Sequence, residues 1–397
     1  MIERPEYMTR LESLKDKQVI KVITGIRRCG KSTLLEMFRE RLLLCGVPES
    51  RIISVNLEDF DFAELKEPKA LHEYVKTRLV RDEMTYVFLD EIQNVQNFPA
   101  VVDSLFIKKN IDLYITGSNA YMLSSEIATL ISGRYIEIKM LPLSFKEYVS
   151  FCGNRTDLGK KYIDYLKNSG FPYTTALSGS DKDVLDYLNG IYSTVILKDV
   201  VGRRAIADPL MLESVIRFVF DNVGSMLSTK KISDVMTSDG RKIDVRTVER
   251  YLSALMECFL VYQAKRYDIK GHQYLKTLEK YYSVDMGLRR MLLGDSGSDA
   301  GHMLENVVYL ELLRRGYRVY VGKVGETEVD FAAMDQSGIT YFQVAASVRD
   351  EATLRRELLP LRKILDHRPK YILTLDEDPE ADYDGIRRMN ALDFLLS

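Results

Sequence analysis

The sequence predicts an α/β fold, and three stretches of the chain carry this prediction. An apolar strand from Val19 to Thr24 runs into a glycine-rich turn and then into a helix. A second apolar strand, Tyr86 to Leu89, ends in an acidic pair, as a central strand of a parallel sheet would. Towards the carboxyl end, residues 302–375 follow the order helix, three strands, helix, strand.

Length and composition limit the classes of protein to which the chain can belong. A chain of 397 residues is long enough for two or three domains. Its 46% hydrophobic and 29% charged residues are ordinary for a soluble globular protein. A net charge of -2 excludes a protein that coats nucleic acid with its whole surface, so any DNA contact must come from a local patch.

Cysteine usage and the amino terminus exclude further classes. The cysteines (Cys29, Cys45, Cys152 and Cys258) are scattered without a CxxC pair, which argues against a disulfide framework or a structural zinc site. The first ten residues lack the apolar stretch of a signal peptide. No apolar run approaches the ~20 residues of a membrane helix. We therefore expect a soluble, cytoplasmic protein without a membrane partner.

The strongest motif is a phosphate-binding loop between the first strand and the helix that carries Leu34, Leu35 and Phe38 on one face. Its glycines let backbone amides approach phosphate, Lys31 reaches the β- and γ-phosphates, and the Ser32 hydroxyl is placed to ligate magnesium. The predicted nucleotide-binding residues are Gly25, Ile26, Arg27, Arg28, Cys29, Gly30, Lys31, Ser32 and Thr33.

An independent second motif, "TYVFLDEIQN", supports the first. Asp90 and Glu91 follow a buried strand, at the end where open α/β sheets place their chemistry. We expect Asp90 to hold the magnesium shell and Glu91 to activate or orient the attacking water. The alternative is two exposed acidic residues that open a helix.

Further polar positions are candidates for contact with a bound nucleotide. "IDLYITGSNA" ends in polar residues, and either Ser118 or Asn119 is expected to sense the γ-phosphate. Arg134 lies at the mouth of another strand and is a candidate arginine finger for a neighbouring subunit, the alternative being an ordinary ion-paired arginine. Arg27 and Arg28 are expected to contact either phosphate or a carboxylate.

The motifs "GIRRCGKSTLL", "LDEIQN", "TGSNA", "SGRY" and "PLSFKEY", in this order, resemble the prokaryotic AAA-type ATPases that carry a C-terminal nuclease-like domain of uncharacterised function. The resemblance spans essentially the whole chain. It implies ATP and Mg²⁺ as ligands, ATP being preferred to GTP, and a parallel sheet with helices on both faces followed by a helical lid. "SGFPY", Ser169 to Tyr173, resembles the Gly-x-Pro lid element of related signalling NTPases, the alternative being a plain turn.

We predict four domains along the chain. They are the AAA-type ATPase core (1–150), a helical lid (151–208), a winged-helix-like domain (209–294) and a restriction-endonuclease-like domain (295–397). The polar linker Asp295 to Gly301 marks the last boundary.

The winged-helix prediction rests on residues 228–284. Val248, Leu252, Leu255 and Phe259 recur at helical spacing, and Val261 to Tyr267 with Lys280 to Val284 could form the wing strands. Arg246 and Arg250 are the candidate DNA contacts. Residues 228–251 carry six basic against four acidic residues, a weak excess for tracking phosphates, so a spacer or an oligomer contact is the alternative.

The last segment resembles a nuclease that has lost its chemistry. Glu305, Asp330 and Gln343 fall where restriction-type nucleases hold their metal, but Gln343 is neutral and Ala345 stands where a lysine is needed. Lys323 or Arg349 could substitute for that lysine. We expect the fold without nuclease activity.

These features favour an ATP hydrolase whose nucleotide state controls the C-terminal domains, with DNA, a protein partner or further copies of the chain as candidate partners. The alternatives are a slow nucleotide-gated switch or DNA-binding regulator, and a metal-dependent DNA nuclease.

Overall fold

The computed structural model describes residues 2–120, 133–202, 206, 208–295 and 300–397, except the side chains of 276 and 277. The chain divides into two compact units. One comprises Met1–Met140 with Glu257–Phe259, and the other comprises Leu141–Met256 with Leu260–Ser397. Each unit is an independent frame for the residues within it.

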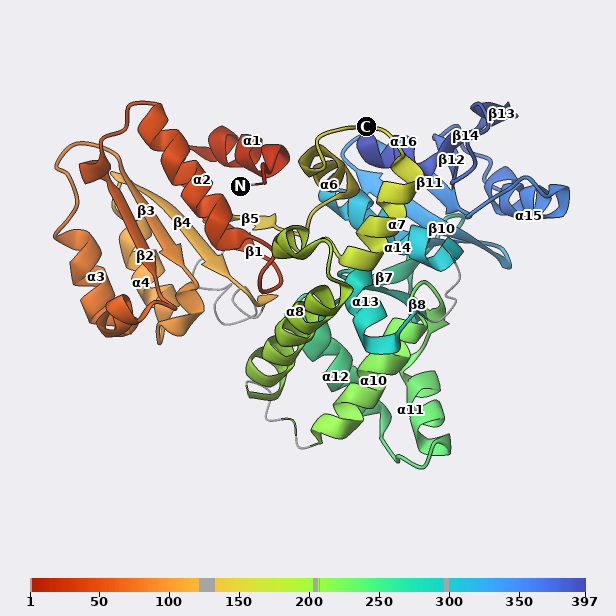
Figure 1. The fold of residues 1–397 in the computed structure, drawn as a ribbon, viewed down its shortest axis with the longest axis horizontal. Coiled ribbons are helices and arrows are strands. Elements are labelled where there is room, and N and C mark those ends of the chain that lie inside the picture. Colours follow the sequence, from red (N-terminus) through yellow and green to blue (C-terminus); the bar gives the residue numbers. More distant parts are fainter. Residues whose placement is uncertain (1, 121–132, 203–205, 207, 296–299) are drawn as a thin grey trace. The chain divides into compact units, whose positions relative to one another are not determined.

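The first unit is built on a five-stranded sheet of order β2-β3-β4-β1-β5, in which every pairing is parallel (Figure 1). Strands β1, β3 and β4 are buried along their whole length, which explains why their sequences are continuous apolar runs. The predicted α/β fold with a parallel sheet is therefore confirmed. The strands are β1 (Ile20–Thr24), β2 (Ile52–Asn56), β3 (Thr85–Asp90), β4 (Ile111–Gly117) and β5 (Tyr135–Lys139).

Helices cover both faces of this sheet. Val87 and Leu89 of β3 pack into one apolar cluster with α3 and α4, whereas Phe88 between them stacks on Tyr114 and meets Phe38 of α2 on the other face. Alternate residues of each strand thus supply opposite faces. The helices are α1 (Pro5–Leu14), α2 (Lys31–Leu44), α3 (Pro68–Lys76) and α4 (Phe98–Phe106), with 3-10 turns η1 (Glu49–Arg51), η2 (Phe60–Lys66) and η3 (Ile92–Asn94).

A buried ion pair joins β1 to β4 near the amino ends of the strands. The Lys21 ammonium contacts the Asp112 carboxylate, and both side chains are essentially inaccessible. Tyr114 donates to Asp112 at 2.8 Å, and the backbone amide of Asp16 donates to it at 2.9 Å. These partners satisfy a charge pair that would otherwise be costly to bury.

The second unit contains a nine-stranded mixed sheet of order β13-β14-β12-β11-β10-β9-β7-β8-β6. Its strands are β6 (Met226–Leu227), β7 (Val261–Asp268), β8 (Gln273–Ser283), β9 (Arg318–Val324), β10 (Thr327–Asp335), β11 (Gly338–Val344), β12 (Lys370–Thr374), β13 (Ala381–Tyr383) and β14 (Ile386–Asn390). Its helices are α6 (Phe145–Phe151), α7 (Leu158–Asn168), η5 (Pro172–Leu177), α8 (Asp181–Thr194), η6 (Val195–Val201), α10 (Pro209–Asp221), α11 (Thr229–Ser238), α12 (Val245–Glu257), α13 (Met286–Leu293), α14 (Ala300–Arg314), α15 (Glu351–Arg362) and α16 (Ala391–Leu396).

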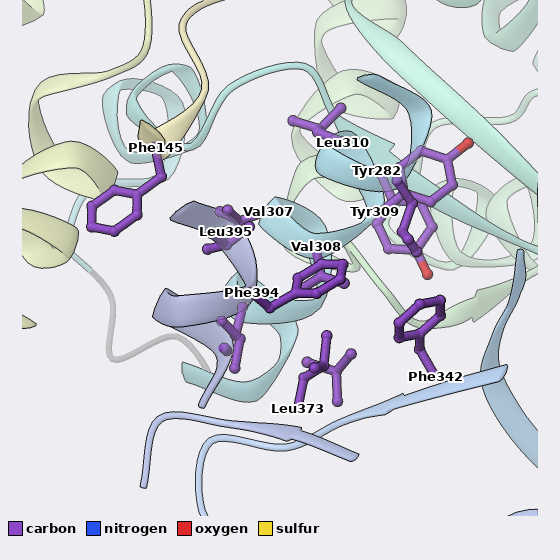
Figure 2. Packing of buried hydrophobic residues seen from close by; sticks show 14 of the residues in the cluster. Phe145, Tyr282, Val307, Val308, Tyr309, Leu310, Phe342, Leu373, Phe394 and Leu395 are labelled. Carbon is purple, nitrogen blue, oxygen red and sulfur yellow. The ribbon is translucent and has the colours of Figure 1, made fainter. Parts of the chain in front are cut away.

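The element order predicted for the last hundred residues is present. After α14, strands β9, β10 and β11 pair antiparallel, and α15 then leads to β12, which pairs parallel with β11. An apolar core forms where α14 and α16 pack against the sheet (Figure 2). Within it, the rings of Tyr282 and Tyr309 stack with centroids 4.0 Å apart.

The structure differs from the four-part division predicted from sequence. The two expected wing strands, β7 and β8, do pair antiparallel. However, β7 also pairs parallel with β9, so one sheet runs across the predicted boundary between residues 294 and 295. The continuous part of the first unit runs to Met140, ten residues before the predicted boundary at residue 150, and Glu257–Phe259 also belong to this unit. Of the predicted linker, residues 296–299 lie outside the described residues.

All four cysteines are free thiols, with Cys29 and Cys258 buried and Cys45 and Cys152 exposed. No helix within the described ranges combines the length and the apolarity that crossing a membrane requires.

Candidate functional site

The glycine-rich loop connects the carboxyl end of β1 to the amino end of α2, as predicted. Gly25 has φ +156°, and a Cβ there would lie 2.2 Å from the carbonyl oxygen of Met140. Gly30, with φ +103°, caps the start of α2. Both positions therefore require glycine, one for close backbone approach and one for a left-handed conformation.

Lys31 is folded back over this loop. Its ammonium group donates to the carbonyl oxygens of Gly25 at 3.0 Å and Ile26 at 3.2 Å. It also lies 3.5 Å from a carboxylate oxygen of Glu91. The lysine is buried, and these carbonyl and carboxylate oxygens surround its charge.

The acidic pair lies at the same edge of the sheet, and Thr116 of the neighbouring strand connects its two members. The Thr116 hydroxyl donates to the Asp90 carboxylate and accepts the backbone N–H of Glu91 at 2.8 Å. Ser32 also hydrogen-bonds to Asp90. Burial raises the pKa of Asp90 above its ordinary value, and the hydrogen bonds from Ser32 and Thr116 partly oppose that rise.

Glu91 is buried rather than exposed at the start of a helix. It has φ +52°, a left-handed conformation that is uncommon for a residue other than glycine. Its carboxylate accepts a hydrogen bond from the Gln93 side-chain amide. Burial alone would raise the pKa of Glu91, but the Lys31 ammonium and the Gln93 amide outweigh it, and the pKa is lowered.

The other loop residues predicted to bind nucleotide differ in their surroundings. Arg27 pairs with the carboxylate of Glu58 at 2.8 Å, whereas Arg28 is exposed and has φ +65°. Cys29 is buried, and Thr33 is exposed on the first turn of α2.

Ser118 and Asn119, the two alternatives for the γ-phosphate sensor, are both buried after β4. Gln93 donates weakly to the Ser118 hydroxyl at 3.4 Å. Sequence inspection missed Arg4, which is buried and donates to the carbonyl oxygen of Cys29 at 3.1 Å. An arginine just before a proline-led helix gives no local sign of such a contact.

Arg134 lies at the opposite end of the strands from the glycine-rich loop. Tyr135, the next residue, is in register with Ile20 at the start of β1, so Arg134 lies near the amino ends of strands whose carboxyl ends carry the loop. Its guanidinium pairs with Asp103 of α4 and lies 5.8 Å from the ring centre of Phe106. Within its own subunit, Arg134 is thus an ion-paired arginine away from Lys31.

The second unit brings together the three residues predicted as a degenerate nuclease site. The Asp330 backbone amide donates to Gln343 at 3.3 Å, and the carboxylates of Asp330 and Glu305 converge on the ammonium group of Lys280. Burial raises the pKa of Glu305 to about 7, although Lys280 opposes this. Sequence inspection missed Lys280 in this role, although it shares one face of β8 with the buried Tyr282, an unusual place for a lysine.

The remaining C-terminal candidates are separate from this cluster or differ in their partners. Arg349 pairs with Asp378 at 2.8 Å, and Ala345 is buried in an apolar cluster. Lys323 lies opposite Glu328 in the ladder between β9 and β10.

Arg246 and Arg250 are both exposed, one turn apart on α12, so their position is compatible with a surface contact. The "SGFPY" segment is anchored rather than free, because the Gly170 amide donates to the buried Asp285 at 2.7 Å.

Comparison with known proteins agrees with the geometry of the loop. Residues 17–149 match the family described as an AAA domain, and residues 159–299 match a domain of unknown function, DUF8612. An uncharacterised protein of Haemophilus influenzae is 38% identical over 400 residues, covering 100% of this chain and 99% of that protein. An uncharacterised protein of Methanocaldococcus jannaschii, MJ1544, is 29% identical over 336 residues, covering 79% of this chain and 71% of that protein.

A solved structure, the Walker-type ATPase PABY2304 of Pyrococcus abyssi, superposes with a TM-score of 0.51 at 15% identity. The match covers 74% of this chain and 96% of that one. At this identity the likeness establishes a shared fold.

The loop geometry predicts an unequal response to two glycine substitutions. Gly25→Ala should lower the melting temperature more than Gly46→Ala, because both glycines have positive φ but only Gly25 has backbone in the path of a Cβ. The positive φ common to both positions costs an alanine about 1–3 kcal/mol. Thermal unfolding followed by circular dichroism measures the difference, and equal losses would show that the Met140 contact is not a constraint.

Proposed function

Because the chain belongs to the same family as its full-length Haemophilus influenzae relative and contains an AAA domain, we propose that it is a Mg²⁺-dependent ATP hydrolase. One observation carries the proposal. Lys31 and Ser32 from the loop and Asp90 and Glu91 from the end of β3, two separate segments, converge at the carboxyl end of one parallel sheet. Such edges are where open α/β sheets bind their ligands.

The loop residues would bind the triphosphate of ATP. The amino end of α2 presents backbone N–H groups and a positive dipole end, both of which favour phosphate. Lys31 would exchange the carbonyl oxygens of Gly25 and Ile26 for phosphate oxygens, because a phosphate carries more negative charge than a carbonyl. Its contact with Glu91 would weaken in the same movement.

Ser32 and Asp90 fit a magnesium ion, since both supply oxygen and already lie within hydrogen-bond reach of each other. When bound, the ion would neutralise negative charge that develops on the phosphates. Thr116 would keep the Asp90 carboxylate directed towards this position through its hydrogen bond.

Glu91 would orient and deprotonate the attacking water. Its lowered pKa keeps it a carboxylate at neutral pH, and Thr116 fixes its backbone. Close by, Gln93 Oε1 is buried and has no hydrogen-bond partner within the described part of the chain. An acceptor without a partner beside a carboxylate suits a position for a water molecule.

The nucleotide state would control the C-terminal unit, and ATP hydrolysis would serve to change that state. A slow nucleotide-gated switch is the alternative, with ATP held tightly and turnover incidental. ATP is preferred to GTP on the family resemblance. We do not propose nuclease activity, because the carboxylates of the candidate nuclease site are engaged by Lys280.

Two substitutions at the site test the proposal. Lys31→Ala should abolish phosphate release from ATP, because the triphosphate loses its ammonium partner. Glu91→Gln should still bind ATP but hydrolyse it at least ~10²-fold more slowly, the usual contribution of a general base. Calorimetry with Mg²⁺-ATP and a phosphate-release assay measure the two steps, with Lys69→Ala on the exposed side of α3 as the matched lysine control.

Undiminished turnover in Lys31→Ala would refute the ATPase. Wild-type turnover no faster than that of Glu91→Gln would identify the slow switch instead.

We further propose that Arg134 acts in a neighbouring copy of the chain. Arg134 lies at the amino ends of the strands, so it cannot reach Lys31 of its own subunit at their carboxyl ends. Nearly half of its side chain is exposed. Arg134→Ala should then lower turnover about 10³-fold or more. Asp103→Asn, which removes only the ion-pair partner, should change it little.

A mixing experiment separates the neighbour from the same subunit. Equimolar Lys31→Ala and Arg134→Ala proteins, each inactive alone, should regain activity when mixed, because each supplies the group that the other lacks. Equal losses in Arg134→Ala and Asp103→Asn, with no recovery on mixing, would reduce Arg134 to a structural ion pair.

DNA is the candidate effector of the C-terminal unit, through the exposed Arg246 and Arg250 of the proposed winged helix. ATP turnover measured with and without duplex DNA should rise, and the rise should fade as salt increases, because phosphate contacts release counterions. The Arg246→Ala, Arg250→Ala double variant should lose the stimulation. If DNA does not change the ATP turnover rate at any salt concentration, a protein partner rather than DNA would be the effector.

A further inference from the structure

A cluster of buried charge lies in the nine-stranded sheet, apart from the nucleotide site. Lys280 of β8 is almost inaccessible, and its ammonium group contacts three carboxylates. The nitrogen lies 2.9 Å from Glu305 of α14, 2.7 Å from Glu328 of β10 and 3.3 Å from Asp330 of the same strand. An ammonium group has three N–H donors, so each carboxylate can take one.

A restriction-nuclease-like fold would hold a divalent metal ion at this place, and the residues present do not fit one. The Oε1 atom of Glu305 already accepts a hydrogen bond from the Lys280 ammonium group and another from the Tyr282 hydroxyl at 2.6 Å. The two oxygens of Asp330 are taken by Lys280 and by the backbone amide of Val344 at 2.9 Å. Three of the four carboxylate oxygens of Glu305 and Asp330 therefore already accept from protein donors, and one cation already lies between the two groups.

Gln343 cannot restore the missing ligand charge. Its carbonyl oxygen accepts the Asp330 amide, and its NH₂ group donates to Glu357 at 2.7 Å. Within the described residues, no group of three or more histidine, cysteine or acidic side chains is arranged to hold a metal ion.

We propose that the ammonium group of Lys280 is the resident cation of this site and occupies the position of the divalent metal that the fold would otherwise bind. The cluster then links α14, β8 and β10 through charge that is internal to the chain. Burial alone would lower the pKa of Lys280, but Glu305, Asp330 and Glu328 raise it above its ordinary value, so the cation persists at neutral pH.

The converse follows from the same contacts. Lys280→Met keeps an unbranched apolar side chain that ends about where Cε of the lysine lies, and it removes the ammonium group, leaving three carboxylates around a site that lacks a cation. Carboxylate oxygens are hard ligands that suit Mn²⁺ or Mg²⁺, and without the ammonium group between them these three carboxylates would be free to close on such an ion. Removing one amino group should therefore convert an internal ion cluster into a site for an external metal ion.

The test is Mn²⁺ binding to the full chain, measured by titration calorimetry and by the electron paramagnetic resonance signal of free Mn²⁺. Wild type and Asp330→Asn should bind equal numbers of ions, because Mn²⁺ held at the nucleotide site is common to both. Lys280→Met should bind one ion more per chain, and Lys280→Met with Asp330→Asn should lose it. Lys280→Arg, which keeps the charge, should gain none.

Thermal unfolding gives a second readout. Lys280→Met should melt below wild type and recover by several degrees when Mn²⁺ is added beyond any rise seen in wild type. A wild-type protein that binds one ion more than Asp330→Asn would overturn the proposal, and so would a folded Lys280→Met that gains no ion. If Lys280→Met does not fold, the comparison of wild type with Asp330→Asn decides in the same way.

Discussion

The parallel register of β1, β3 and β4 is the constraint on which the nucleotide site depends. Because the three strands run in one direction, the loop after Thr24, the pair after Leu89 and the end of β4 all emerge at one edge of the sheet. Thr116 then joins two of these strand ends through one hydroxyl group. Residues separated by many positions in sequence become neighbours because of strand direction alone.

The N-terminal site was largely predictable, because its signals are local. A strand, a glycine-rich turn and a helix start fix Lys31 and Ser32 within a few residues of each other, and an apolar run ending in Asp90 and Glu91 identifies the facing strand. The parallel sheet with helices on both faces, which the family resemblance implied, is also present. The carboxylate partner of Arg27 was one of two alternatives left open by the sequence.

The rest depends on contacts that local patterns do not encode. Lys280 meets Glu305 and Asp330 only because a strand expected to form a wing joins the same sheet as β10. That pairing of β7 with β9 also explains why the predicted boundary at residue 294 separates no compact unit. In the sequence, Gln343 and Ala345 indicated that a charged metal ligand and a lysine are missing from the candidate nuclease site. No residue near them indicated that Lys280 would supply a cation there.

The contact between Gly25 and Met140 places the glycine-rich loop against the residue at which the chain leaves the first unit. Met140 donates its N–H to Thr24 at 2.7 Å, and its carbonyl oxygen lies against the Gly25 backbone. Met140 is also the last residue before the second unit begins along the chain. A displacement of the Gly25 backbone would therefore also displace Met140, the residue at which the chain leaves the first unit.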